Sequence, residues 1–234
     1  MVPGKLSIAI IIPVLNEADS LLAVLAEVPF ASGEVEIVVV DGGSTDSTPT
    51  LAEKAGARVV HEPQRGYGRA CAAGSAATEA DVLVYMDGDG SNVPADILRL
   101  LEPIQDGEAD MVIGARQVGD LPPGAMPPHQ RFGNWLAAAL IRGLYGLSVT
   151  DLGPFRAIRR EALAALDMRD MTYGWPTEML VKAIRAGYRV REVPVGYRPR
   201  LGGVSKISGT LRGSVLAAWH ILSTTLRYVW WTSP

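Results

Sequence analysis

The sequence predicts a single α/β domain with a mostly parallel β-sheet flanked by helices. Short apolar runs alternate with helical patterns along the first half of its 234 residues, and this alternation is typical of parallel sheets. Three of the apolar runs end in polar clusters, namely Asn16-Glu17, Asp41-Gly42-Gly43-Ser44 and Asp87-Gly88-Asp89. Ligands of such sheets bind at the carboxyl ends of the strands. The clusters therefore predict where the functional site lies.

Five strands are expected in the first half, because each run is apolar on both faces and is bounded by turn residues. They span residues 8–12, 35–40, 58–61, 82–86 and 111–115. Helical patterns occupy the stretches between them, near residues 17–28, 46–55, 68–79 and 94–105. A proline- and glycine-rich loop follows at 117–128, and a loop of about a dozen residues in a compact domain is usually functional or mobile.

The second half continues with helical patterns near 130–146, 159–166 and 176–186, a strand near 189–195 and a glycine- and arginine-rich loop at 196–207. The C-terminal segment, 208–234, is expected to form an amphipathic helix to about residue 231 that belongs to the same domain. Its arginines and terminal aromatic residues suit a membrane interface, although a helix docked on the core has the same pattern. Neither a membrane-spanning helix nor a targeting segment is expected.

Charge divides the chain into two unlike halves, although the whole sequence carries a net charge of only −3. Residues 1–115 hold 18 acidic and 6 basic side chains, a balance of −12. Residues 116–234 hold 7 acidic and 16 basic side chains, a balance of +9, and 14 of those 16 are arginine. Arginine forms paired hydrogen bonds with phosphate, so the second half predicts a phosphate-containing ligand. The single cysteine, Cys71, excludes a disulfide scaffold.

The segment Asp87-Gly88-Asp89 is the clearest candidate for a metal site. Two carboxylates at a strand end can both reach one hard cation, and Mg²⁺ and Mn²⁺ prefer oxygen ligands. A simple turn explains the same residues, because Asp-Gly is a common turn dipeptide. Asp41 has two open interpretations, a hydrogen-bond acceptor for a nucleotide or a turn residue. Glu17 follows a candidate N-cap, Asn16, and either contacts a ligand or favours the helix dipole.

A glycine-rich turn, Arg65-Gly66-Tyr67-Gly68, opens a helix and is a candidate cradle for a nucleotide. Its glycine spacing differs from that of a dinucleotide fingerprint, and the first strand ends without glycine. A nicotinamide-dependent dehydrogenase is therefore not expected.

In this order, these motifs resemble family 2 glycosyltransferases, most closely the polyprenyl-phosphate branch with the dolichyl-phosphate mannose and glucose synthases. The resemblance covers residues 7 to 207. It is carried by Ile12-Pro13-Val14-Leu15-Asn16-Glu17, Val40-Asp41-Gly42-Gly43-Ser44-Thr45-Asp46, Arg65-Gly66-Tyr67-Gly68, Asp87-Gly88-Asp89, Asp151-Leu152-Gly153-Pro154-Phe155-Arg156 and Gly202-Gly203-Val204-Ser205-Lys206. It implies a GT-A fold for residues 1–207, with a Rossmann-like sheet, a nucleotide-sugar donor and Mg²⁺ or Mn²⁺.

The resemblance also implies roles for individual residues. Donor-binding residues are expected at Pro13, Glu17, Asp41, Gly66, Asp87, Ser205 and Lys206. Asp87 and Asp89 are expected to hold the donor diphosphate through the metal, which places Asp89 among the catalytic residues. Arg116 and Arg131 are expected to meet the phosphate of a lipid acceptor and to act in catalysis. Further acceptor-side contacts are expected from Arg156, Arg200 and Glu178. For Glu178, a structural role is the alternative.

Three positions depart from the family pattern. Gly42 stands where the family usually has a second Asp, and Ser91 stands where mannose synthases often have Gln. Met179 stands where many hydroxyl-glycosylating relatives carry an Asp that acts as general base. A hydroxyl must lose its proton during attack, whereas a phosphate is already ionised at neutral pH. The missing base therefore favours a phosphate nucleophile.

We therefore expect an inverting, metal-dependent transfer of a hexose from a UDP- or GDP-sugar to polyprenyl or dolichyl phosphate. The protein is expected to be cytoplasmic and peripheral at the cytoplasmic face of the membrane, with no nucleic-acid partner. Three alternatives stay open: a glycosyltransferase with a soluble hydroxyl acceptor, a nucleotidyltransferase, and a non-catalytic sugar-nucleotide-binding protein. The sequence does not predict the sugar, the base or the oligomeric state.

Overall fold

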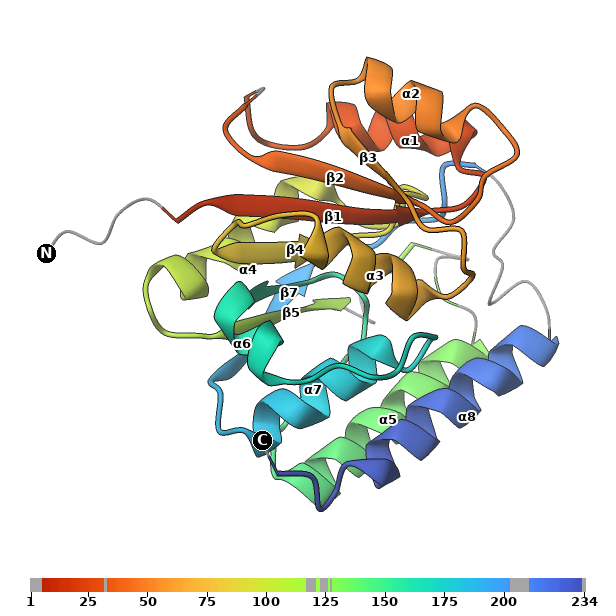
Figure 1. Ribbon diagram of the computed structural model, residues 1–234. Helices are drawn as coiled ribbons and strands as arrows, with labels where there is room; N and C mark the ends of the chain where they lie inside the picture. Colours follow the sequence, from red (N-terminus) through yellow and green to blue (C-terminus); the bar gives the residue numbers. More distant parts are fainter. Residues whose placement is uncertain are drawn as a thin grey trace, which may run out of the picture.

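The computed structural model describes residues 6–31, 33–116, 121–122, 126, 128–202 and 211–232, with the backbone alone described at 129–130 and 211–218. A seven-stranded sheet runs through the middle of the molecule, and helices cover both of its faces (Figure 1). Its order is β3-β2-β1-β4-β6-β5-β7. The strands are β1 (Ile8–Val14), β2 (Glu36–Asp41), β3 (Arg58–His61), β4 (Val82–Tyr85), β5 (Met111–Arg116), β6 (Arg156–Arg159) and β7 (Val190–Val195). Only the pairings of β6 are antiparallel among those described, which confirms the predicted mostly parallel sheet.

The helices divide between two layers, because successive side chains of a strand point to opposite faces of the sheet. Along β1, Ile8, Ile10 and Ile12 join one core, whereas Ala9 and Ile11 join the other. The first core is covered by α1 (Ala18–Ala26), α2 (Thr48–Lys54) and α4 (Ile97–Gln105), the last preceded by a short 3-10 helix, Pro94–Asp96. The second is covered by α3 (Tyr67–Ala76), α5 (Pro128–Tyr145), α6 (Arg160–Ala165) and α7 (Trp175–Arg185).

The sequence does not predict β6, which the structure places between β4 and β5. Its four residues are too few to show a strand period, and they run directly into α6 at Arg160. Because β6 is antiparallel to both neighbours, β4 and β5 are parallel to each other. Their carboxyl ends therefore lie at the same edge of the sheet, two strand spacings or about 10 Å apart.

The C-terminal helix α8 (Leu211–Arg227) lies alongside α5 at the base of the molecule in the view of Figure 1. The Tyr145 hydroxyl of α5 donates a hydrogen bond to the carbonyl of Thr225. The chain then turns onto α7, where the ring centres of Tyr228 and Trp231 lie 4.7 and 5.1 Å from Lys182 Nζ. The helix thus ends at Arg227 rather than near 231. None of the helices in the described part of the chain combines the length and the apolarity needed to cross a bilayer.

A buried ion pair joins α7 to the turn before it. Lys182 Nζ lies 2.7 Å from Glu178 Oε1, and neither side chain has exposed surface. Glu178 also accepts hydrogen bonds from the backbone N–H groups of Arg169 and Asp170, and Lys182 donates to the carbonyl of Asp167 at 2.6 Å. Buried charges are tolerated when their hydrogen bonds are complete, so this pair and its backbone partners form one structural unit.

Replacing Lys182 with Met is expected to lower the free energy of unfolding by about 3–5 kcal/mol, because Glu178 is left buried and unpaired. Urea unfolding measures the loss. Glu79→Gln is the matched control, since it breaks the exposed 2.8 Å pair between Glu79 and Arg160 and is expected to cost less than about 1 kcal/mol. Equal costs for the two variants would show that the buried pair is not a structural unit.

Candidate functional site

The candidate site lies at the edge of the sheet where β2, β1 and β4 end, and these strands are neighbours in that order. Val14 at the end of β1 pairs with Asp41 at the end of β2, and β4 ends beside them at Tyr85. Glu17 follows β1 after a short loop, and Asp87 follows β4 after one residue. The three polar clusters of the sequence therefore meet at one edge.

Neighbouring groups hold the loop Asp87-Gly88-Asp89 in place. Asp89 Oδ1 accepts hydrogen bonds from the backbone N–H of Ser91 at 2.9 Å and from its hydroxyl at 2.6 Å. The N–H of Asp87 donates to Asn92 Oδ1 at 3.1 Å. Gly88 has to be glycine, because a Cβ there would lie 2.7 Å from a methyl group of β1. The loop is thus rigidly packed against the strand beside it.

The two carboxylates of this loop repel each other. Burial and then the charge of Asp89 raise the pKa of Asp87 to about 7, against the opposing effects of Arg116 and Arg200. Ionising Asp87 is therefore costly without a further positive charge. This is the electrostatic condition expected of a site that binds a cation.

Asp87 and Asp89 fit a Mg²⁺ or Mn²⁺ ion that shares its shell with a substrate. Such ions commonly take one or two protein carboxylates and complete their coordination with phosphate oxygens and water. Within the described residues, no cluster of three or more His, Cys, Asp and Glu side chains is arranged to hold a metal by itself. The two carboxylates of Asp87 and Asp89 match the one or two that such an ion takes when it binds with a diphosphate.

Arg200, expected at the acceptor, binds two of the carboxylates that are expected on the donor side. Its Nη1 donates to Asp89 Oδ2 at 2.7 Å, and its Nη2 donates to both carboxylate oxygens of Glu17 at 2.8 and 3.0 Å. The backbone brings it there, since the N–H of Leu201 donates to the carbonyl of Asp89 at 3.0 Å. In this state Arg200 supplies the positive charge that the carboxylates require.

Asp41 and Pro13, expected to contact the nucleotide, lie on adjacent strands. Pro13 pairs with Val40 and is half-buried, and Asp41 follows as the last residue of β2. Asp41 Oδ1 accepts a hydrogen bond from the N–H of Ser44 at 3.0 Å, and Oδ2 lies 3.5 Å from His61 Nδ1. Asp41 therefore organises its own turn, and this contact is compatible with a second role toward a ligand.

Hydrogen bonds join the loops that follow β1 and β2. The N–H of Asn16 donates to Ser44 Oγ at 2.8 Å, and Asn16 Oδ1 accepts from the N–H of Thr45 at 2.8 Å. Asn16 has φ of 52°, a left-handed conformation that asparagine tolerates. It is not the N-cap of α1, a position that Glu17 occupies. The asparagine instead fixes one polar cluster against the next.

Arg116, at the end of β5, is held by Asp151. Its Nε and Nη2 each donate to a different carboxylate oxygen of Asp151 at 2.6 Å. Its guanidinium lies 5.0 Å from the ring centre of Tyr197. Burial opposes the charge, but the hydrogen bonds and the charge of Asp151 raise the pKa of Arg116 above its usual value. Arg116 is therefore a fixed positive charge at the same edge as the carboxylates.

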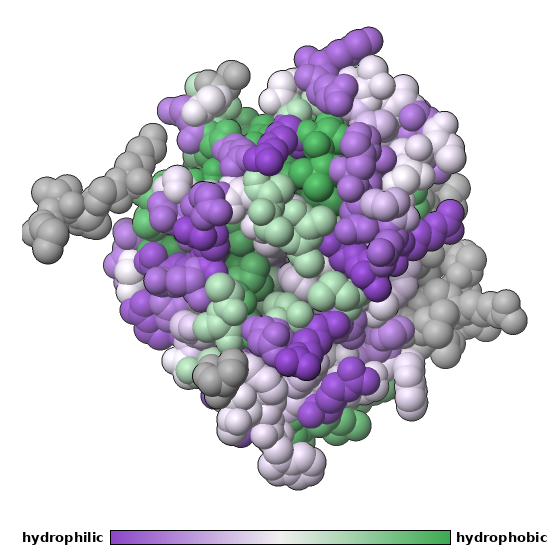
Figure 2. Space-filling model, in the orientation of Figure 1, coloured by the Kyte–Doolittle hydropathy of each residue, from purple (hydrophilic) through white to green (hydrophobic). Residues whose placement is uncertain are grey.

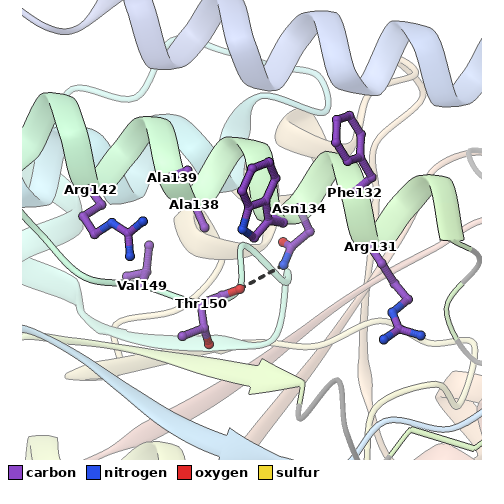
Figure 3. A pocket seen from close by; sticks show the side chains of 9 residues that line it. Arg131, Phe132, Asn134, Ala138, Ala139, Arg142, Val149 and Thr150 are labelled. Atoms are coloured by element: carbon purple, nitrogen blue, oxygen red, sulfur yellow. Dashed lines mark hydrogen bonds between the residues drawn. The ribbon is translucent and has the colours of Figure 1, made fainter.

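Arg131 lies exposed on the first turn of α5. It lines an open groove of about 490 Å³ together with Phe132, Asn134, Arg142 and Thr150 (Figure 3). In that view Arg131 and Arg142 extend to the same side of the helix. The groove thus offers two guanidinium groups and an aromatic ring along one helix.

The structure explains Gly66 and Gly68 without a ligand. A Cβ on Gly66 would lie 2.3 Å from the carbonyl oxygen of Met171, and Gly66 has φ of 150°. The N–H groups of Gly68 and Arg69 donate to the carbonyls of Thr172 and Met171, each at 3.2 Å. These two first-turn donors of α3, Gly68 and Arg69, are therefore occupied by protein.

Arg156 and Glu178 are also placed differently from the sequence-based expectation. Arg156 is 1% exposed, and its guanidinium donates to the carbonyls of Gly153 and Pro176. Burial lowers its pKa to about 10. Glu178 has no exposed surface, because its oxygens bind Lys182 and the preceding turn. Both side chains are therefore enclosed by protein in this structure, which favours the structural role for Glu178.

Two expected residues, Ser205 and Lys206, lie outside the described residues. The structure adds Asn92 and Tyr197, which form an isolated antiparallel bridge and contact Asp87 and Arg116 respectively. No local signal marks either residue, because the bridge joins segments far apart in sequence. Asp151 does have a signal, since it begins one of the motifs that carry the family resemblance.

The chain is similar over most of its length to known glycosyltransferases. A family model described as Glycosyl transferase family 2 matches residues 9–167. An uncharacterized glycosyltransferase of Mycobacterium tuberculosis is 41% identical over 221 residues, which cover 93% of this chain and 98% of that protein. An undecaprenyl-phosphate mannosyltransferase of Micrococcus luteus is 35% identical over 222 residues, which cover 88% of this chain and 89% of that protein.

A solved structure shares the architecture. Glucosyl-3-phosphoglycerate synthase from Mycobacterium tuberculosis, crystallised with Mn²⁺, UDP and glucosyl-3-phosphoglycerate, matches with a TM-score of 0.78 at 26% identity. The match covers 95% of this chain and 80% of that one, and it confirms the GT-A fold implied by the motifs. Fold, motif order and relatives agree, and the chain belongs to glycosyl transferase family 2.

Proposed function

We propose that this protein transfers a hexose from a nucleotide sugar to a polyprenyl phosphate at a membrane surface. One observation carries the proposal: Asp87 and Asp89 lie at the same edge of the sheet as Arg116. The two carboxylates follow β4, and Arg116 ends β5, which lies two positions from β4 in the sheet. A metal-bound donor diphosphate requires the carboxylates, and an anionic acceptor requires the arginine. The similarity to an undecaprenyl-phosphate mannosyltransferase supports this acceptor class.

On the donor side, Asp87 and Asp89 would hold Mg²⁺ or Mn²⁺, with Pro13, Glu17 and Asp41 along the nucleotide. A divalent ion bound there supplies positive charge that stabilises the departing nucleoside diphosphate. Arg200, which donates to Asp89 Oδ2 in this structure, would add a further positive charge beside the ion. We propose that the Arg200 guanidinium also meets phosphate oxygens of the donor, a role expected as well of Ser205 and Lys206, which lie outside the described residues.

On the acceptor side, Arg116 and Arg131 would hold the phosphate of the lipid. On the first turn of α7, Glu178 is buried against Lys182, and the following Met179 cannot accept a proton. A phosphate acceptor is ionised at neutral pH, so its attack requires no general base. Proximity and charge stabilisation then account for catalysis, and attack opposite the leaving diphosphate inverts the anomeric carbon.

Two neighbouring helices present the surface that we assign to the membrane. On α8 and just after it, Trp219 is 67% exposed and Trp230 is 85% exposed, and on α5 Phe132 and Trp135 are 63% and 61% exposed. Arg227 is also exposed. Figure 2 shows hydrophilic residues beside near-neutral and hydrophobic ones over this lower part of the molecule. Aromatic and arginine side chains on such helices suit binding at a membrane interface, which we propose is the cytoplasmic face.

A soluble phosphorylated acceptor is the second candidate, because the similar synthase crystallised with glucosyl-3-phosphoglycerate. The test uses two separate reactions, each with the protein, radiolabelled UDP- and GDP-sugars and Mg²⁺ or Mn²⁺. One reaction contains undecaprenyl phosphate as acceptor, and the other contains 3-phosphoglycerate. Label in the organic phase supports the lipid acceptor, and label confined to the aqueous product supports the soluble one. No transfer from any donor would overturn both.

Replacing Asp89 with Asn is expected to reduce hexose transfer by about 100-fold or more, because one carboxylate can no longer offset the charge of the bound cation and diphosphate. Mn²⁺ titration in the presence of the nucleoside diphosphate should show weakened binding in parallel. The control is Asp81→Asn at the other end of β4, where the Asp81 carboxylate accepts hydrogen bonds from the backbone N–H and the hydroxyl of Ser7. Unchanged transfer and Mn²⁺ affinity in Asp89→Asn would remove this residue from the metal site.

Replacing Trp219 and Trp230 together with Ala is expected to weaken binding to phosphatidylglycerol vesicles by about tenfold or more. Each exposed aromatic ring would lose part of the roughly 1.5–3 kcal/mol available from burial of a large apolar side chain. Vesicle co-sedimentation measures the change. Leu98→Ala is the control, since Leu98 is 50% exposed on α4 in the other helical layer. If both variants bind like the wild type, these tryptophans do not contact the membrane.

A further inference from the structure

Asp151 directs its whole carboxylate to Arg116. It is 1% exposed, and its Oδ2 accepts the backbone N–H of Arg116 at 2.8 Å and Nε at 2.6 Å. Its Oδ1 accepts Nη2 of the same residue at 2.6 Å. A backbone anchor and two side-chain bonds from one residue leave the guanidinium very little freedom to rotate.

The geometry of this pair matters for a second anion. A guanidinium has five N–H donors, and a side-on pair through Nε and Nη2 uses one edge of it. The edge formed by Nη1 and Nη2 is the one suited to two phosphate oxygens. The guanidinium carbon of Arg116 lies 5.0 Å from the ring centre of Tyr197, and this contact also restrains the orientation of the guanidinium plane. Holding a long arginine side chain in advance reduces the entropy lost when a ligand binds.

The segment containing Asp151 is itself tied to two other elements. Glu192 of β7 accepts the backbone N–H groups of Thr150 and Asp151, both at 2.9 Å. Asn134 of α5 donates to the carbonyl of Thr150 at 3.0 Å, the bond drawn in Figure 3, and accepts the N–H of Leu152 at 3.0 Å. The short segment Thr150–Leu152 therefore links β5, β7 and α5.

The link to α5 reaches the second arginine of the proposed acceptor site. Asn134 follows Arg131 by one helical turn, so the two residues occupy the same side of α5. Asp151 thus holds Arg116 directly, while the residues beside it hold the helix that carries Arg131. The segment Thr150–Leu152 thus connects the strand that ends in Arg116 with the helix that carries Arg131.

We propose that Asp151 is a positioning residue for the acceptor: it orients Arg116 and, through Thr150–Leu152, sets its placement relative to Arg131 so that both can meet one phosphate. The inference rests on the proposed function, because it requires a phosphate acceptor. It assigns Asp151 no contact with the substrate. A positioning role predicts an effect on acceptor binding with little effect on donor binding.

The test is Asp151→Asn, which keeps the shape of the side chain but places an amide group against the donors of Arg116. The expected result is a KM for undecaprenyl phosphate raised about tenfold or more, with the Kd for Mn²⁺ and the nucleoside diphosphate unchanged. Calorimetry measures the second quantity without any transfer reaction.

The chain contains a matched control for this substitution. Asp110, just before β5, accepts the backbone N–H of Arg189 at 2.9 Å, Nε at 3.0 Å and Nη2 at 2.7 Å. Asp110→Asn therefore breaks the same three-bond arrangement at the opposite end of the strand from Arg116. It is expected to leave both constants unchanged, so a general loss of stability is separated from a loss of positioning.

A second pair of variants tests whether Asp151 acts through Arg116. The two variants are Arg116→Gln and the double variant Arg116→Gln with Asp151→Asn, and we expect them to have equal KM values for the acceptor. The double variant also serves if Asp151→Asn alone does not fold, because it removes both charges and leaves neither buried and unpaired. Unequal values would overturn the inference. So would an Asp151→Asn enzyme whose acceptor KM stays within about twofold of Asp110→Asn. A wild-type protein that transfers nothing to undecaprenyl phosphate would instead reject the proposed function itself.

Discussion

The burial of two neighbouring carboxylates, Asp87 and Asp89, is the constraint around which the candidate site is built. One glycine separates the two carboxylates, and packing against β1 leaves that glycine no room for a side chain. The groups around them respond to this negative charge: Ser91 donates to Asp89, and Arg200 bridges Asp89 and Glu17. In this structure the guanidinium of Arg200 therefore offsets part of the negative charge of the site.

The parts of this site that could be predicted from sequence are the ones encoded locally. The first, second and fourth strands are continuous apolar runs, because both of their faces are buried, and each is followed by polar residues. Parallel order then forces those residues to one edge. The same reasoning cannot find β6, because its four residues, beginning at Arg156, have no recognisable period.

Partners far apart in sequence could not be predicted. Arg200 was expected near an anion, and its residue type supports that, but its pairing with Glu17 depends on how the segment after β7 lies along the Asp89 loop. Arg156 and Glu178 show the reverse case. Charged residues are usually exposed, so a sequence offers no sign that these two are enclosed and bonded within the second core. Gly66 and Gly68 likewise have a nucleotide-loop composition but are required by a close backbone contact.

The rings of Tyr228 and Trp231 cover the ammonium group of Lys182, which lies on α7 and more than 40 residues earlier in the sequence. Until Tyr228 and Trp231 have left the ribosome, Lys182 stays open to water on that side and its pair with Glu178 cannot be fully desolvated. The second core is therefore completed only after every residue of the candidate site has emerged. A chain that stopped at Arg227 would keep all of those residues and still lack the cover of this ion pair, so a shortened protein would lose stability before it lost any of its chemistry.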